Sequence, residues 1–188
     1  NYTRSHGIIL PRVPSSPTQT VQMVSLLAHE LFHIASRVGP TDFRDRMYEL
    51  AGFHRVSPGP MPAAFESRRL TNPDAYTHHH ALQVLSKSQG QVLVIPVLSS
   101  RLSRKELTRN TTLQRAVDLR LAPLSAAGTF QIRGKQLMTM PVSDTDYAVI
   151  ASLNTRYIIH PEEILADNFA LLIQHRAGYQ TTIDHPEI

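Results

Sequence analysis

Two histidines and a glutamate in segment 27–35 (LAHELFHIA) have the types and spacing of a metal-dependent hydrolytic site. His29 and His33 are four residues apart, so on an α-helix their side chains lie about 40° apart and one turn from each other. Two imidazoles placed in this way can bind one zinc ion. Glu30 lies about 100° round the helix from His29, where a carboxylate can take a proton from water that zinc has acidified.

A catalytic zinc ion needs a third protein ligand. The metzincin continuation, Gly-x-x-His directly after the motif, is excluded because Ser36 and Gly39 occupy those positions. The other known arrangement takes a glutamate from a later helix, with an aspartate four residues beyond it. Glu163-Ile-Leu-Ala-Asp167 has this spacing. Glu163 could then ligate the metal while Asp167 accepts the free ring N–H of His29 and fixes its orientation.

Two other residues stay open as the third ligand. Glu162 and His160 both lie close to Glu163 in the sequence. Glutamates in the first turn of a helix are also favoured by the helix dipole alone, which gives Glu162 and Glu163 a purely structural explanation. A mid-helix aspartate such as Asp167 has poor helix propensity, and this favours a functional reason for its presence.

These two motifs together resemble the gluzincin class of zinc metallopeptidases. The resemblance implies that His29, His33 and Glu163 are the zinc ligands, that Glu30 is the general base and that Asp167 orients a histidine. It also implies a zincin-like α+β fold with two active-site helices and a small mixed sheet, here as one domain over residues 1–188. The separation departs from the pattern, since 129 residues lie between His33 and Glu163. Either the intervening strands are an insertion, or the third ligand lies elsewhere.

A peptidase also needs a donor for the oxyanion that develops on the substrate carbonyl. Tyr157, a few residues before the proposed ligand helix, is the first candidate. The other candidates are side chains that could donate a hydrogen bond, namely His54, Arg55, His160 and the run His78-His79-His80.

The helices that must position these groups are marked by clear boundary signals. The pattern predicts a helix from Thr18 or Thr20 to about Arg37, ended by Gly39-Pro40. It predicts a closing helix over 161–176, with proline first, two glutamates in the first turn and a glycine just past the end. A second helix is expected from Thr41, with Phe43, Met47 and Leu50 on one face.

The middle of the chain predicts strands. Residues 91–98 (QVLVIPVL) favour a strand, and Pro96 suggests an edge position or a bulge. Residues 101–120 are arginine-rich with leucines at irregular helical spacing, and we expect an amphipathic helix with a solvated basic face. A hairpin is predicted around Gly134-Lys135, and 147–153 favours a strand or a buried helical turn.

Composition narrows the class further. The chain has 188 residues, 41% of them hydrophobic, enough for one compact domain. It has no cysteine, which excludes a disulfide scaffold, a cysteine-ligated zinc site and a thiol nucleophile. A net charge of +4 is too small for a nucleic-acid binder, and no apolar run is long enough for a membrane span. The chain begins at Asn1, so we expect a processed or trimmed N-terminus, which slightly favours a secreted or periplasmic protein.

The motifs therefore predict a zinc-dependent peptidase that cleaves a peptide or protein substrate with Glu30 as general base. The alternative is a catalytically silent zincin-like domain that binds zinc and a partner. In a third hypothesis the motif is coincidental and the domain is a metal-free interaction module.

Overall fold

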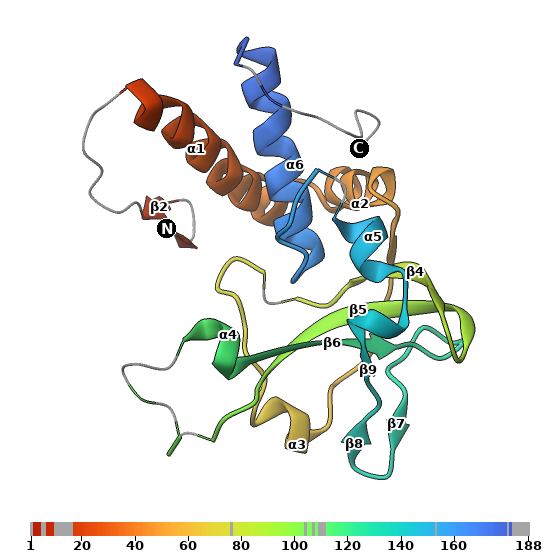
Figure 1. Ribbon diagram of the computed structural model, residues 1–188. Coiled ribbons are helices and arrows are strands. Elements are labelled where there is room, and N and C mark those ends of the chain that lie inside the picture. The colour runs from red at the N-terminus through yellow and green to blue at the C-terminus, as the bar shows by residue number, and fades with distance from the viewer. Residues whose placement is uncertain are drawn as a thin grey trace. The chain divides into compact units, whose positions relative to one another are not determined.

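The computed structural model describes residues 2–4, 7–9, 17–75, 77–103, 105–106, 108, 112–152, 154–179 and 181. They form a mixed α+β protein, as predicted (Figure 1). The chain divides into two compact units. Unit 1 comprises Asn1–Gly52, Asn72–Tyr76 and Ala151–Ile188, and unit 2 comprises Phe53–Thr71 and Thr77–Ile150. The expectation of a single domain over residues 1–188 stays a prediction.

Unit 1 is mainly helical. Its long elements are α1 (Pro17–Val38), α2 (Thr41–Leu50) and α6 (Pro161–Arg176). A short antiparallel hairpin, β1 (Tyr2–Arg4) and β2 (Gly7–Ile9), precedes them.

The end of α1 follows from its sequence. The N–H of Gly39 donates to the carbonyl of Ala35 at 2.8 Å, and a Cβ on Gly39 would lie only 2.5 Å from that oxygen. Only glycine therefore fits this close turn. Pro40 follows and cannot continue the helix, so its extended backbone starts α2 instead. The predicted boundary at Gly39-Pro40 is confirmed.

The start and end of α6 are also those predicted. Pro161 occupies the first turn, where its missing N–H is not needed. The ring Nδ1 of His160 accepts a hydrogen bond from the backbone N–H of Glu162 at 3.1 Å and so caps the helix. Gly178, with φ of 81°, takes the left-handed conformation just past the last turn.

Helices α1 and α6 lie side by side (Figure 1). The rings of Phe32 on α1 and Phe169 on α6 pack with their centroids 5.7 Å apart. Ala28, Ala166 and Ala170 are buried, and such small side chains let two helices approach closely. The first turn of α6 is thereby brought opposite the middle of α1.

The helix α2 is present as predicted, but its apolar face is largely exposed. Phe43 and Leu50 are 51% and 67% exposed, whereas Tyr48 is buried. The helix is rotated so that Tyr48 faces α6, where its hydroxyl donates to the carboxylate of Glu162. A buried hydrogen bond to a carboxylate thus outweighs the burial of two apolar side chains.

Unit 2 is built on one antiparallel sheet with the strand order β3-β4-β5-β6-β9. These strands are β3 (Phe53–Arg55), β4 (His80–Ser86), β5 (Gly90–Ser100), β6 (Val117–Pro123) and β9 (Met140–Pro141). Every pairing in this sheet is antiparallel, so the predicted mixed sheet is wrong. Neighbouring strands are joined through hairpins and loops, which favour antiparallel pairing.

The predicted strand 91–98 is confirmed as part of β5, but it is central and not at an edge. The pairing of β4 with β5 ends at Leu82 opposite Val94. Pro96 lies beyond this point and pairs only with Leu121 of β6. A proline is tolerated there because β4 requires no N–H from it.

The helix expected over residues 101–120 is wrong. Among the described residues of this stretch, the only helix is the short α4 (Leu113–Ala116), which is followed by β6 from Val117. The predicted hairpin is confirmed as β7 (Ile132–Arg133) and β8 (Gln136–Leu137), and 147–151 is the helical turn α5 (Tyr147–Ala151). The remaining elements of unit 2 are α3 (Ala63–Glu66) and the 3₁₀ turn η1 (Val142–Asp144).

One core cluster of unit 2 lies on one side of the sheet, and apolar residues of the opposite face, such as Val94 and Leu121, are buried as well. In this cluster, buried apolar residues of the central strands meet those of α3 and the β7–β8 hairpin. Its members include Ile95, Val97 and Ala122 from the strands, Phe65 from α3 and Leu137 from β8.

In the described part of the chain, none of the helices combines the length and apolar character needed to cross a membrane.

Candidate metal centre

Helix α1 directs two imidazole rings toward the first turn of α6. The rings of His29 and His33 pack edge to face one turn apart, with centroids 4.8 Å apart and planes at 81°. His33 is 1% exposed, while His29 lies at the margin of a cavity. This follows from their spacing of four residues, since positions i and i+4 share one face of a helix.

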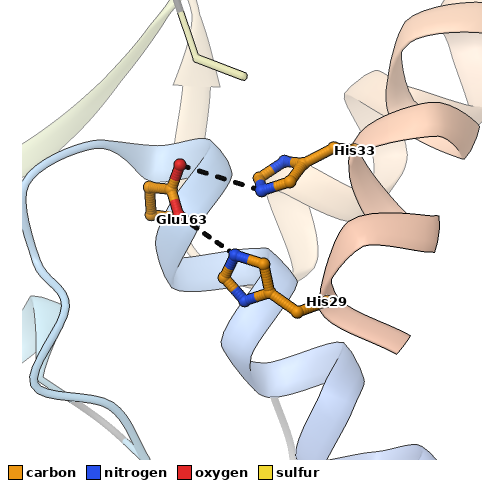
Figure 2. Close-up of side chains that lie close together, drawn as sticks. All are labelled: His29, His33 and Glu163. Carbon is orange, nitrogen blue, oxygen red and sulfur yellow. Dashed lines mark hydrogen bonds and ion pairs between the residues drawn. The ribbon is translucent and has the colours of Figure 1, made fainter. Parts of the chain in front are cut away.

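Glu163 on α6 completes the group (Figure 2). Its Oε2 lies 3.2 Å from Nε2 of His29, and its Oε1 lies 3.7 Å from Nε2 of His33. The three ligand atoms lie within 4.8 Å of one another. Atoms bound to one tetrahedral zinc ion at about 2.1 Å are roughly 3.4 Å apart. The donor set of two nitrogens and one carboxylate oxygen therefore fits zinc in both chemistry and spacing.

Asp167 lies behind His29. Its Oδ1 is 2.8 Å from Nδ1 of His29, on the ring edge away from Glu163. Its Oδ2 accepts a hydrogen bond from the hydroxyl of Thr155, and the same hydroxyl oxygen accepts the backbone N–H of Tyr157 at 3.0 Å. Thr155 thus connects the loop that carries Tyr157 to the carboxylate that holds His29.

Glu162 points to a different place from Glu163. Its Oε1 lies 3.2 Å from Nδ1 of His33, and its Oε2 accepts the hydroxyls of Ser36 and Tyr48. Burial of Tyr48 and the negative charge of Glu162 raise the pKa of the Tyr48 hydroxyl far above its ordinary value, so this hydroxyl stays protonated. The two alternative ligands, Glu162 and His160, therefore both have structural partners of their own.

A short segment of unit 1, residues 72–75, covers the other side of Glu163. The side-chain amide of Asn72 donates to Oε1 of Glu163, and its own oxygen accepts the N–H of Asp74 at 3.0 Å. Neither residue was identified from the sequence. The only available signal was the turn-forming sequence Asn72-Pro-Asp74, which marks a loop and not a site.

Glu30, His33 and Asp74 form a second group whose ligand atoms lie within 4.8 Å of one another. The carboxylate of Asp74 already has a hydrogen-bond donor and a positively charged neighbour. Its Oδ1 accepts the backbone N–H of Thr3 at 2.8 Å and lies 3.6 Å from the guanidinium of Arg37. The group of His29, His33 and Glu163 is therefore the better candidate for a metal.

A cavity of about 530 Å³ opens onto these side chains. Its lining includes the two histidines, Glu30, Glu163 and Asp167, together with Tyr157. Burial and the charges of Glu163, Asp167 and Asp74 raise the pKa of Tyr157 to about 12, so its hydroxyl is a hydrogen-bond donor at neutral pH.

The other oxyanion candidates lie elsewhere. His54 and Arg55 are exposed on β3 of unit 2, and His78 contacts Arg69 there, with Nε2 3.0 Å from Nη1. His79 and His80 also belong to unit 2, while His160 caps α6. Among the described candidates, Tyr157 is the one that lines the cavity.

Comparisons with protein-family models, with curated proteins and with solved structures find no match to this chain. Its function must be inferred from its own residues.

His29 is unusually basic when no metal is bound. Burial of the ring opposes protonation, but the hydrogen bonds and charges of Asp167 and Glu163 outweigh it and raise the pKa from 6.5 to about 10. A histidine with a raised pKa stabilises the fold in full below the unfolded value of 6.5. This contribution is lost as the pH rises through the folded value.

We therefore expect the melting temperature of the metal-free protein to fall between pH 6.5 and pH 10. The measurement is thermal unfolding by circular dichroism in the presence of a chelator. His29→Gln removes the titrating group, and its melting temperature should depend less on pH. Parallel curves for wild type and variant over this range would contradict the prediction.

Proposed function

We propose that this chain is a zinc-dependent peptidase of the gluzincin type, with a zincin-like site in unit 1. In this proposal His29, His33 and Glu163 hold the metal. The observation that carries it is the meeting of two separate motifs, His-Glu-x-x-His on α1 and Glu-x-x-x-Asp on α6, with their ligand atoms at the spacing of a tetrahedral ion. Residues 34–162 separate the two motifs, so their meeting is not a local consequence of sequence.

Zinc in such a site acts as a Lewis acid that acidifies water and polarises a carbonyl. Glu30 takes the proton of the attacking water and passes it to the leaving amine. It is suited to this role because it is 1% exposed and lines the same cavity as the ligands.

Two further residues support the reaction. The Tyr157 hydroxyl, which stays protonated at neutral pH, donates to the oxyanion that develops on the substrate carbonyl. Asp167 accepts Nδ1–H of His29 and so directs Nε2 toward Glu163. The substrate class we propose is a peptide or protein, bound at the cavity that the ligand group lines.

The first test is the zinc content per chain of protein purified without added metal. We expect about one zinc ion in wild type, as three protein ligands require, and a sharp loss in Glu163→Ala. Glu49→Ala is the matched control, because Glu49 is an exposed glutamate on α2 of the same unit. It should keep the zinc content of wild type.

Each outcome separates the hypotheses. Zinc in wild type and its loss in Glu163→Ala, together with cleavage of a peptide library, would support the peptidase. The same metal result without cleavage of any peptide would favour the silent zinc-binding domain. Wild type that takes up no zinc even after incubation with it would overturn both.

A further inference from the structure

A carboxylate outside the ligand group is buried against the second histidine. Glu162 in the first turn of α6 is only 7% exposed, although charged residues are rarely buried without partners. Its two oxygens have separate neighbours. Oε1 faces Nδ1 of His33, and Oε2 accepts hydrogen bonds from Ser36 at 2.9 Å and from Tyr48.

These contacts place Glu162 on the side of the His33 ring away from Glu163. The ring presents Nε2 to Glu163 and Nδ1 to Glu162. If Nδ1–H donates to Glu162, the lone pair of the neutral His33 ring lies on Nε2, the nitrogen that faces Glu163. A carboxylate in this place selects the tautomer that can bind a metal.

The hydroxyls of Ser36 and Tyr48 hold the carboxylate itself in place. Ser36 is three residues after His33 on α1, and Tyr48 comes from α2, so two helices fix the orientation of Glu162. Both partners are neutral donors, and they stabilise a buried anion without cancelling its charge. The carboxylate is therefore fixed in direction before any metal binds.

We propose that Glu162, held by Ser36 and Tyr48, is a positioning residue that fixes the tautomer and ring orientation of His33. Each ligand histidine then has its own carboxylate, Asp167 for His29 and Glu162 for His33. The inference rests on the proposed function and extends it from the metal ligands to the residues that prepare them.

The test is the affinity for zinc of purified Glu162→Gln, measured by competition with a chromophoric chelator. Glutamine keeps the shape and can still bond to Ser36 and Tyr48, but it lacks the charge that faces His33. We expect the Kd for zinc to rise by about 10–100-fold, as for other residues that orient metal ligands. The visible spectrum of the cobalt(II)-substituted protein should also change, because it reports the geometry of the ligands.

Three matched variants make the result specific. Asp167→Asn is the corresponding change behind His29 and should weaken zinc binding to a similar degree. Glu49→Gln removes an exposed carboxylate and should leave the Kd unchanged. Tyr48→Phe removes one donor to Glu162 without touching His33, so it should weaken binding less than Glu162→Gln does. A role in fold stability alone would lower the melting temperature but leave the Kd and cobalt spectrum of the folded protein unchanged.

Equal zinc affinity and equal cobalt spectra in wild type and folded Glu162→Gln would overturn this proposal alone. Wild type that binds no zinc would overturn the proposed function and this proposal with it. Should Glu162→Gln fail to fold, Tyr48→Phe decides, and an unchanged Kd in that variant overturns the proposal.

Discussion

Under the proposed function, Glu30→Gln is expected to bind zinc as the wild type does and to lose peptidase activity. Glutamine has the same shape as glutamate but cannot accept the proton of the attacking water. Removing a general acid–base residue lowers kcat by about 10²–10⁴-fold. The zinc content should not change, because His29, His33 and Glu163 are intact. The measurements are zinc per chain and the rate of cleavage of a fluorogenic peptide selected with the wild type.

Glu49→Gln is the control for this change, since it alters an exposed glutamate at a site away from the cavity lining. It should retain the wild-type rate. Wild-type activity in zinc-loaded Glu30→Gln would contradict the role of Glu30 and the proposed mechanism with it.

His33→Ala should cause the largest loss of stability among changes at this site. The His33 ring is almost completely buried between Glu162 and Glu163. Its removal leaves a void between two buried carboxylates and takes away the hydrogen-bond partner of Glu162 Oε1. Leaving a buried acceptor without its hydrogen-bond partner costs about 1–3 kcal/mol of unfolding free energy, and the cavity left by the ring adds to this cost. Urea unfolding in the presence of a chelator measures this loss independently of bound metal.

His175→Ala is the matched control because His175 is exposed in the last turn of α6. It should cost no more than about 1 kcal/mol, the usual contribution of a residue near a helix end. If His33→Ala changed neither stability nor zinc content, the motif would be coincidental and the metal-free interaction module would be favoured.

The two helices that carry the site could be predicted closely from local signals. Gly39-Pro40 ends α1, while Pro161 begins α6 and Gly178 follows its end. These residues act through backbone geometry, which does not depend on the rest of the fold. The spacing within each motif likewise determines which side chains share a helix face.

Other elements depend on tertiary contacts that no local pattern encodes. Leucines at irregular helical spacing favoured a helix over 101–120, yet Val117–Pro123 is a strand because β5 and β9 pair with it on either side. In α2 the spacing of Phe43 and Leu50 favoured an apolar face. The buried bond from Tyr48 to Glu162 instead determines how that helix is rotated.

The same distinction applies to the site. The ligand group could be proposed from two motifs, but the groups that surround it come from unrelated places in the chain. Ser36, Tyr48 and Asn72 have no shared spacing, and each is an ordinary polar residue in its own segment. Glu162 and Glu163 are both buried, and it is their contacts that separate their roles, since Glu162 faces Nδ1 of His33 and Glu163 faces Nε2 of both histidines.

The insertion of unit 2 between α1 and α6 has a consequence for biosynthesis. His29 and His33 leave the ribosome early, whereas Glu163 is added 130 residues after His33. At about 5–20 residues per second this interval lasts roughly 6–26 s. During that time the nascent chain holds two of its three proposed ligands and its proposed base, but no complete metal site. Under the proposed function, a polypeptide that stops short of α6 therefore cannot become a protease.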